Sequence, residues 1–209
     1  MDIVQYPVCR YIDEFHIEKH VDINYGLIKG IECIFANWWS GSPITYSVWN
    51  KIFKRHIFDN IRFKEGHISE DTILMVDLYK RAKSIYLSEK GMYYYQIRKG
   101  SYTHKYTFKS HMDLYNAHFE IYKEFNNFPS LSSESIIAYT RLYRRLLQAK
   151  IENPKENIKN EIRSVSKLFP PINVIIRSKS RDKIWLITAK LLGFKLFSIL
   201  YNNYMKLKK

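Results

Sequence analysis

The sequence predicts a mixed α/β region over residues 1–107 and a mainly α-helical, basic region over residues 108–209. Short apolar, partly β-branched runs separated by turn residues fill the first region, as strands require. Longer runs with apolar residues at helical spacing fill the second. The net charge of +14 is also uneven, because residues 1–140 carry 17 basic and 16 acidic side chains, whereas residues 141–209 carry 17 and 4.

The composition is that of a folded protein. Hydrophobic residues make up 46% and charged residues 26% of the 209 residues, which excludes a disordered chain and leaves room for one core with an appendage. Cys9 and Cys33 are the two cysteines, too few for a disulfide framework or a cysteine metal site, so a reduced cytosolic setting is expected. Residues 1–6 lack the basic and apolar pattern of a signal peptide.

The elements of the first region follow from apolar patterning and turn residues. Residues 3–8 predict a buried strand, residues 11–19 a loop or exposed element, and residues 26–39 a helix. Residues 48–55 predict a short turn or helix. Ser69 is a suitable N-cap for a helix that continues to residue 83. Two strands are then expected, over residues 85–87 and 92–98.

Helical periodicity dominates the second region. The expected helices cover residues 108–126, 132–152, 157–168 and 182–209. Phe169-Pro170-Pro171 ends the third of them, since proline cannot continue a helix.

Three segments of the first region carry side chains suited to chemistry, and they follow one another in a fixed order. The first combines an aromatic residue with basic ones, the second leads through a glycine turn into two acids, and the third ends in basic and polar residues. They read Trp49-Asn50-Lys51-Ile52-Phe53-Lys54-Arg55, then Arg62-Phe63-x-x-Gly66 with Glu70-Asp71, then Arg98-Lys99-Gly100-Ser101-x-x-His104.

The order and spacing of these segments resemble the second half of the catalytic domain of family-2 glycosyltransferases. The resemblance covers roughly residues 1–110. It implies a GT-A-like fold, with residues 1–107 as the acceptor-side part of the domain. It also implies a nucleotide-binding half with an Asp-x-Asp metal motif upstream, which this chain is expected to start too late to contain.

The resemblance gives Asp71 the role of general base, taking the proton of the acceptor hydroxyl as that oxygen attacks the anomeric carbon. A carboxylate suits this step because it is ionised at neutral pH and a helix N-terminus keeps it so. Glu70 then orients Asp71 or binds an acceptor hydroxyl. Both acids could instead serve only to stabilise the start of the helix.

The resemblance also implies substrate-binding residues. Trp49 would stack on a sugar face, unless it is a packing anchor, and Lys51 and Arg55 would meet phosphate, unless they are solvated surface residues. The remaining residues would bind the departing diphosphate through their cationic groups and hydroxyl: Arg98, Lys99 and Ser101.

A divalent metal, Mn²⁺ or Mg²⁺, is the cofactor that the resemblance implies. His104 would complete its site together with the upstream Asp-x-Asp. The alternative is an ordinary loop histidine.

The last segment is apolar but interrupted. Lys190 and Lys195 lie within the apolar stretch of residues 184–200, and a lysine at a bilayer centre is costly, so an interfacial helix on an anionic membrane is expected over residues 180–209 rather than a spanning one. A helix packed on the catalytic domain is the alternative.

The sequence thus predicts an inverting glycosyltransferase of polysaccharide or cell-surface glycan synthesis, truncated here, that moves a hexosyl or similar group from a nucleotide-sugar to a glycan or lipid-linked acceptor. Its expected location is the cytoplasm, with peripheral contact to the inner face of the cell membrane. One alternative is an inactive acceptor-binding or complementing half-domain. A basic nucleic-acid-binding protein is a third, but no nucleic-acid-binding signature accompanies the basic tail, so no nucleic-acid partner is expected.

Overall fold

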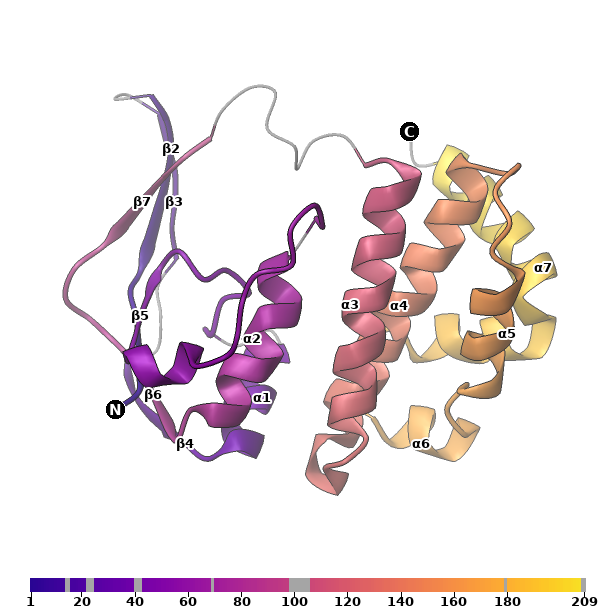
Figure 1. The fold of residues 1–209 in the computed structure, drawn as a ribbon. Helices are drawn as coiled ribbons and strands as arrows, with labels where there is room; N and C mark the ends of the chain where they lie inside the picture. The colour runs from indigo at the N-terminus through magenta and orange to yellow at the C-terminus, as the bar shows by residue number, and fades with distance from the viewer. Residues whose placement is uncertain are drawn as a thin grey trace. The chain divides into compact units, whose positions relative to one another are not determined.

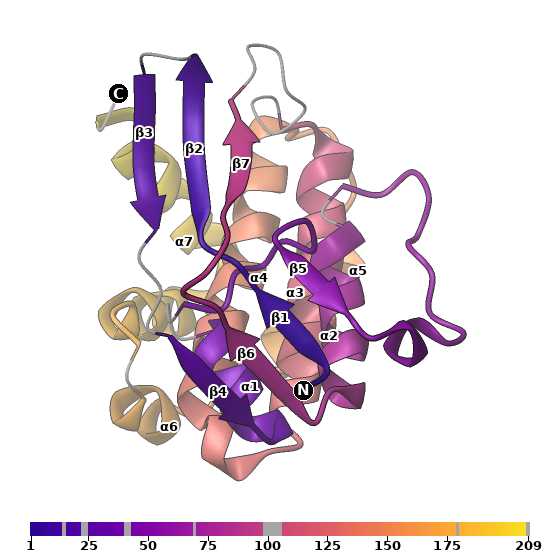
Figure 2. The same cartoon turned by 90° about the vertical axis from the view of Figure 1, so that its left-hand side faces the viewer.

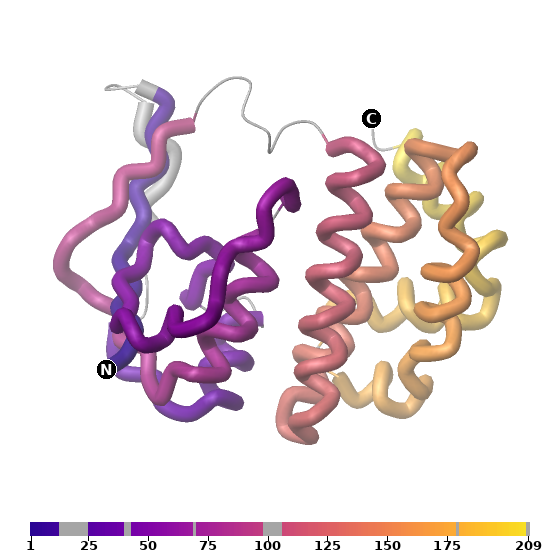
Figure 3. The backbone as a smooth tube through the Cα atoms, viewed as in Figure 1, coloured from indigo at the N-terminus to yellow at the C-terminus, as the bar shows by residue number. Residues whose placement is uncertain are grey.

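The computed structural model describes residues 1–13, 16–21, 25–39, 43–68, 70–97, 106–178 and 180–207 (Figures 1 and 3). The chain divides into two compact units, Met1–Tyr106 and Thr107–Lys209. The first is mixed α/β and the second is helical, which confirms the predicted fold class. The assignment of the first unit to a GT-A-like domain stays a prediction.

A four-stranded mixed sheet is the base of the first unit. Its strands, in spatial order, are β4 (Gly26–Lys29), β6 (Ser84–Leu87), β1 (Ile3–Gln5) and β5 (Lys51–Phe53). Strands β1 and β6 are parallel, and the other two neighbouring pairs are antiparallel (Figure 2). The parallel pair brings residues about eighty positions apart side by side, with Ile3 opposite Ile85.

A second, three-stranded sheet continues the two central strands. Its order is β3 (His16–Val21), β2 (Val8–Asp13) and β7 (Tyr93–Gln96), with β2 antiparallel to β3 and parallel to β7. Strand β1 leads into β2 and β6 leads into β7, as Figure 2 shows. Backbone hydrogen bonds bridge the break, from the Ser88 amide to the Gln5 carbonyl and from the Tyr93 amide to the Pro7 carbonyl.

Helices α1 (Ile31–Trp39) and α2 (Glu70–Arg81) cover one face of the four-stranded sheet (Figures 1 and 2). Their inward side chains meet those of β1 and β6 in a core that is closed to water. Trp38 and Tyr79 join the two helices, with ring centroids 5.2 Å apart. The fully buried side chains of this core include Ile3, Ile34, Phe35, Met75, Leu78 and Ile85.

The second unit is built on the helical pair α3 (Phe108–Phe125) and α4 (Ser132–Glu152), linked through the 3₁₀ helix η3 (Pro129–Leu131). A capping box between Thr107 and Ser110 starts α3, which satisfies backbone amides that the helix itself leaves free. Three further helices complete the described part of this unit: α5 (Lys159–Lys167), α6 (Ile172–Arg177) and α7 (Lys183–Leu207).

Three expectations about local structure were wrong, and strand pairing is the reason in each case. Residues 11–19 fall largely in the paired strands β2 and β3 rather than in a loop. Residues 26–39 do not form one helix, because residues 26–29 pair with β6 and Gly30, at φ 83°, turns the chain into α1. Residues 51–53, expected in a turn or helix, pair with β1 as β5, and η1 (Arg55–Phe58) follows.

The predicted C-terminal helix is present as α7, but it is broken within. Gly193 has φ 68° and ψ 170°, a conformation outside the helical region that non-glycine residues rarely adopt. The element therefore consists of two helical halves on either side of this glycine.

Candidate active site

The acidic pair lies at the start of α2. Glu70 and Asp71 are its first two residues, both half-buried, and the predicted cap Ser69 lies outside the described residues. The pKa of Asp71 is raised, chiefly by burial and then by the neighbouring charge of Glu70. Hydrogen bonds from the Thr72 backbone and hydroxyl, and the charge of Lys51, oppose this rise. Asp71 is thus a stronger base than an exposed aspartate.

Lys51 is buried beneath the loop of residues 43–50, at the start of β5. Its ammonium, which has three N–H donors, lies within hydrogen-bonding distance of four oxygens: the Thr45 carbonyl at 3.0 Å, the Thr45 hydroxyl at 2.7 Å, the Ser47 carbonyl at 2.6 Å and the Asn50 side-chain oxygen at 3.2 Å. Burial holds the pKa of Lys51 well below its usual value, while the charge of Asp71 acts in the opposite direction. The charge of Lys51 in turn lowers the pKa of Asp71 and so favours its ionised form.

The same loop is fixed to the end of β1 by buried amide side chains. Gln5 is inaccessible to solvent, donates to the Pro43 carbonyl at 2.6 Å and accepts from the Thr45 amide at 2.9 Å. Asn50 is likewise buried, donates to the Tyr6 carbonyl at 3.0 Å and accepts from the Thr45 hydroxyl at 2.8 Å. Buried amides that have partners hold a loop in a single conformation.

Tyr79 links this loop to α2. Its ring is fully buried, and its hydroxyl lies 3.5 Å from the Thr45 carbonyl, to which it donates. Burial raises the pKa of Tyr79 well above its usual value, and the charge of Asp71 adds to the rise. The phenol therefore stays neutral and remains a hydrogen-bond donor. Asp71, Lys51 and Tyr79 thus form one electrostatically coupled group, which we call the Asp71 cluster.

Trp49 is part of an aromatic stack. Its ring centroid lies 4.6 Å from that of Tyr93 and 4.9 Å from that of Tyr95, with interplanar angles of 33° and 25°. Both tyrosines come from β7 and, being two residues apart on a strand, share one face. Trp49 is only partly exposed, so the stack fixes its orientation while leaving some of the indole accessible.

Of the other predicted site residues, the structure describes Arg55. Arg55 is exposed at the start of η1. Arg98, Lys99, Ser101 and His104 lie outside the described residues, so their roles stay predictions. Within the part of the chain that the structure describes, no group of three or more His, Cys, Asp or Glu side chains could hold a metal ion, and the predicted divalent cation likewise stays a prediction.

The sequence patterns did not identify Gln5, Thr45 and Tyr79 as parts of the site. One signal was available for Gln5, a polar residue at the end of an apolar strand, because buried polar groups need specific partners. Thr45 and Tyr79 carry no such signal, since their meeting depends on the packing of α2 against the loop.

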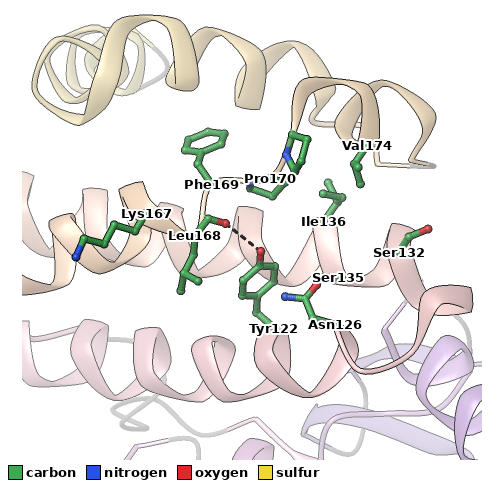
Figure 4. A pocket seen from close by; sticks show the side chains of 11 residues that line it. Tyr122, Asn126, Ser132, Ser135, Ile136, Lys167, Leu168, Phe169, Pro170 and Val174 are labelled. Carbon is green, nitrogen blue, oxygen red and sulfur yellow. Dashed lines mark hydrogen bonds between the residues drawn. The ribbon is translucent and has the colours of Figure 1, made fainter.

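A cavity of about 280 Å³ in the second unit is a separate feature. It lies between α3, α4 and the turn before α6, and Figure 4 shows the Tyr122 hydroxyl directed at the Leu168 carbonyl, 3.0 Å away. Phe169, Pro170 and Ile136 give it a largely apolar wall. None of the described residues that line it carries a carboxylate, so these residues offer no carboxylate base for catalysis.

Comparison with known proteins gives a partial relative. The glycosyltransferase GlyA of Streptococcus pneumoniae serotype 4 is 29% identical over 97 residues, which are 46% of this chain and 14% of that protein. The aligned part is therefore a small fraction of the relative. No protein-family model matches the chain. The similarity supports a relationship to glycosyltransferases in general.

Proposed function

We propose that this chain is the acceptor-side part of an inverting, family-2-like glycosyltransferase of the GT-A kind, with Asp71 as the general base. The observation that carries the proposal is a half-buried carboxylate of raised pKa at a helix start, coupled to a buried ammonium and a fixed loop, in a chain related to a glycosyltransferase. The donor would be a nucleotide-sugar and the acceptor a glycan or a lipid-linked sugar, in the synthesis of a surface polysaccharide.

The reaction is a single in-line displacement. Asp71 accepts the proton of the acceptor hydroxyl while that oxygen forms a bond to the anomeric carbon. The bond from that carbon to the diphosphate oxygen breaks at the same time, and the nucleoside diphosphate leaves with the electron pair. One carboxylate suffices, and the anomeric configuration inverts because attack occurs opposite the leaving group.

The environment of Asp71 suits this task. A general base is most effective when its pKa approaches the working pH, and burial together with Glu70 moves the pKa of Asp71 in that direction. The Lys51 charge and the Thr72 hydrogen bonds oppose this rise in the pKa of Asp71. Lys51 and Glu70 thus act on catalysis through Asp71.

Substrate contacts would come from the neighbouring segments. The accessible part of the Trp49 indole would pack on an acceptor ring, held in place by Tyr93 and Tyr95. Arg55, Arg98 and Lys99 would neutralise phosphate, and the Ser101 hydroxyl would donate a hydrogen bond to it. Lys51 is buried and its four contacts order the loop, so we expect it to support this surface rather than to be reached by a large substrate.

A divalent metal, Mn²⁺ or Mg²⁺, would neutralise the charge of the leaving diphosphate when bound. The described residues do not form its site by themselves, and His104 with an upstream Asp-x-Asp would have to provide it. The steps proposed above for Asp71, Lys51 and Glu70 do not depend on how that cation is held.

The test is transfer itself. The chain, joined to a nucleotide-binding part that carries an Asp-x-Asp, is incubated with a panel of nucleotide-sugars, Mn²⁺, and glycan or lipid-linked acceptors, and products are analysed by mass spectrometry and NMR. The proposal predicts acceptors enlarged by one glycosyl unit, with the anomeric configuration opposite to that of the donor. Products of retained configuration would contradict the inverting mechanism.

A half-domain that binds acceptor without turnover is the alternative, favoured by the partly exposed Trp49 ring that Tyr93 and Tyr95 hold as a stacking surface for a sugar. It predicts saturable acceptor binding by NMR in the absence of any transfer, and loss of that binding in Trp49→Ala. Transfer by the chain would exclude it.

A further inference from the structure

The first half of α7 is held firmly to the second unit. Leu186 and Ala189 are fully buried, and Arg144 of α4 pairs with Asp182 at 2.6 Å just before the helix starts. Lys190, one of the two lysines that interrupt the apolar run, donates to the Pro170 carbonyl at 2.8 Å and lies over the Phe169 ring. The ammonium of Lys190 therefore already has partners within the protein.

The second half begins after the break at Gly193 and has two different sides. One side packs inward, where Phe197 lies 4.9 Å from Trp185 and Phe194 lies 5.5 Å from Tyr143. The other side exposes large apolar residues at spacings of three and four, which place them on one stripe of the helix. This stripe, the outer face, consists of Leu196 (56% exposed), Ile199 (53%), Leu200 (52%), Tyr204 (50%) and Leu207 (88%).

The helix is long and apolar enough to be considered as a membrane span. Among the described residues, Lys183–Leu207 has the length and composition of a possible span, with a mean hydropathy of 1.6 over an 18-residue stretch. The break at Gly193 argues against spanning, because the second half of fourteen residues extends only about 21 Å and a bilayer core is about 30 Å thick. The buried contacts of the first half argue against it as well.

Charge indicates what covers the outer face. Residues 168–209 contain nine Lys and Arg and a single acid, Asp182, which is paired with Arg144. Lys195 and Lys206 are exposed and lie along one edge of the apolar stripe, by helical geometry. Two copies of this chain would bring like charges together, whereas an anionic lipid surface satisfies both the apolar stripe and the lysines beside it.

We propose that the outer face of α7 docks flat onto an anionic lipid bilayer. The apolar stripe enters the boundary between head groups and acyl chains, and Lys195 and Lys206 contact the anionic head groups. This surface is independent of glycosyl transfer and holds the protein at the membrane without spanning it.

Vesicle flotation with the full chain tests the proposal. Wild type is expected to float with vesicles of phosphatidylcholine and phosphatidylglycerol, far less with phosphatidylcholine alone, and less as salt is raised. Leu196→Glu combined with Leu200→Glu should reduce the bound fraction roughly tenfold or more. Ile52→Glu in the first unit, which changes a residue of similar exposure, 59%, is the matched control and should float as wild type.

The contribution of the lysines to vesicle binding is tested with a second variant and its own control. Lys195→Gln with Lys206→Gln should weaken binding to the anionic vesicles roughly tenfold, whereas Lys155→Gln with Lys159→Gln, exposed elsewhere in the same unit, should have little effect. Wild type that stays unbound, or equal flotation of Leu196→Glu/Leu200→Glu and Ile52→Glu, would overturn the proposal. A dimer that these glutamates dissociate, without vesicle binding, would assign the face to a second copy, and preferential binding to DNA would assign it to nucleic acid.

Discussion

At the scale of single residues, the raised pKa of Asp71 makes catalysis sensitive to Glu70. A general base works only when ionised, so activity should rise with pH through the pKa of Asp71, which lies above the usual aspartate value of 3.8. Glu70→Gln removes the negative charge that is the second cause of the raised pKa of Asp71. We expect it to lower the pKa of Asp71 and to shift the acidic limb of the pH–rate profile to lower pH.

The control for Glu70→Gln is Asp77→Asn, an exposed acid on the same helix, which should leave that limb in place. The profile of kcat/KM against pH is the measurement. An acidic limb that moves equally in both variants would mean that Glu70 acts only through the overall charge of the helix.

The contacts of Lys51 lead to a prediction about the stability of the folded protein. Lys51→Met removes the ammonium that satisfies four loop oxygens, so the free energy of unfolding should fall by about 2–4 kcal/mol. Urea unfolding is the measurement, with the exposed Lys64→Met as control. Unchanged stability in Lys51→Met would contradict an ordering role for the ammonium.

The lowered pKa of Lys51 also predicts how the stabilities of wild type and Lys51→Met change with pH. Because the pKa of Lys51 is lower in the folded than in the unfolded chain, wild type should gain stability as pH rises toward the unfolded value of 10.5. The difference between wild type and Lys51→Met should therefore change across this window in favour of wild type. A difference that stays constant across it would contradict the lowered pKa.

At the scale of elements, Gly193 sets the path of α7. Alanine at φ 68° and ψ 170° is strained, so Gly193→Ala should destabilise the protein by about 1–3 kcal/mol or straighten the helix and separate Phe197 from Trp185. Either result lowers the thermal midpoint and alters tryptophan fluorescence. Asn203→Ala, in the second half of the helix, is the control. A midpoint equal to wild type would show that the break is not required.

Elements were predictable where local pattern and tertiary pairing agree. The helices α2, α3 and α4 have strong periodicity, and the structure places them within two residues of the predicted bounds. Strands β4 and β5 were not predictable because four and three residues carry little pattern, and partners far along the chain decide their conformation. The break in α7 was also missed, since an isolated glycine inside an apolar run is compatible with a continuous helix.

The candidate site likewise has features that the sequence could predict and features that depend on tertiary packing. The acids at positions 70 and 71 and the Trp49 segment could be selected from sequence, because residue type and spacing mark them. The electrostatic coupling of Asp71 to Lys51 and Tyr79 could not be predicted from sequence. The burial of Lys51 and the contact between Tyr79 and Thr45 arise only when α2 packs beside the loop of residues 43–50. The roles of the selected residues stay predictions.

At the scale of the whole molecule, the two units divide two tasks in this account. The first unit holds the Asp71 cluster, and the second carries most of the positive charge and the outer face of α7. A lipid-linked acceptor lies in a membrane, so a chain that docks on that membrane meets its acceptor at a high local concentration.

The most direct measurement is acceptor-dependent release of nucleoside diphosphate by Asp71→Asn compared with Asp77→Asn, under identical donor, acceptor and Mn²⁺ concentrations. Loss of a general base lowers turnover by roughly a hundredfold to ten-thousandfold, and the account predicts this for Asp71→Asn with an unchanged KM for the donor. Asp77→Asn should turn over as wild type. Equal turnover in the two variants would contradict the assignment of Asp71 as the base.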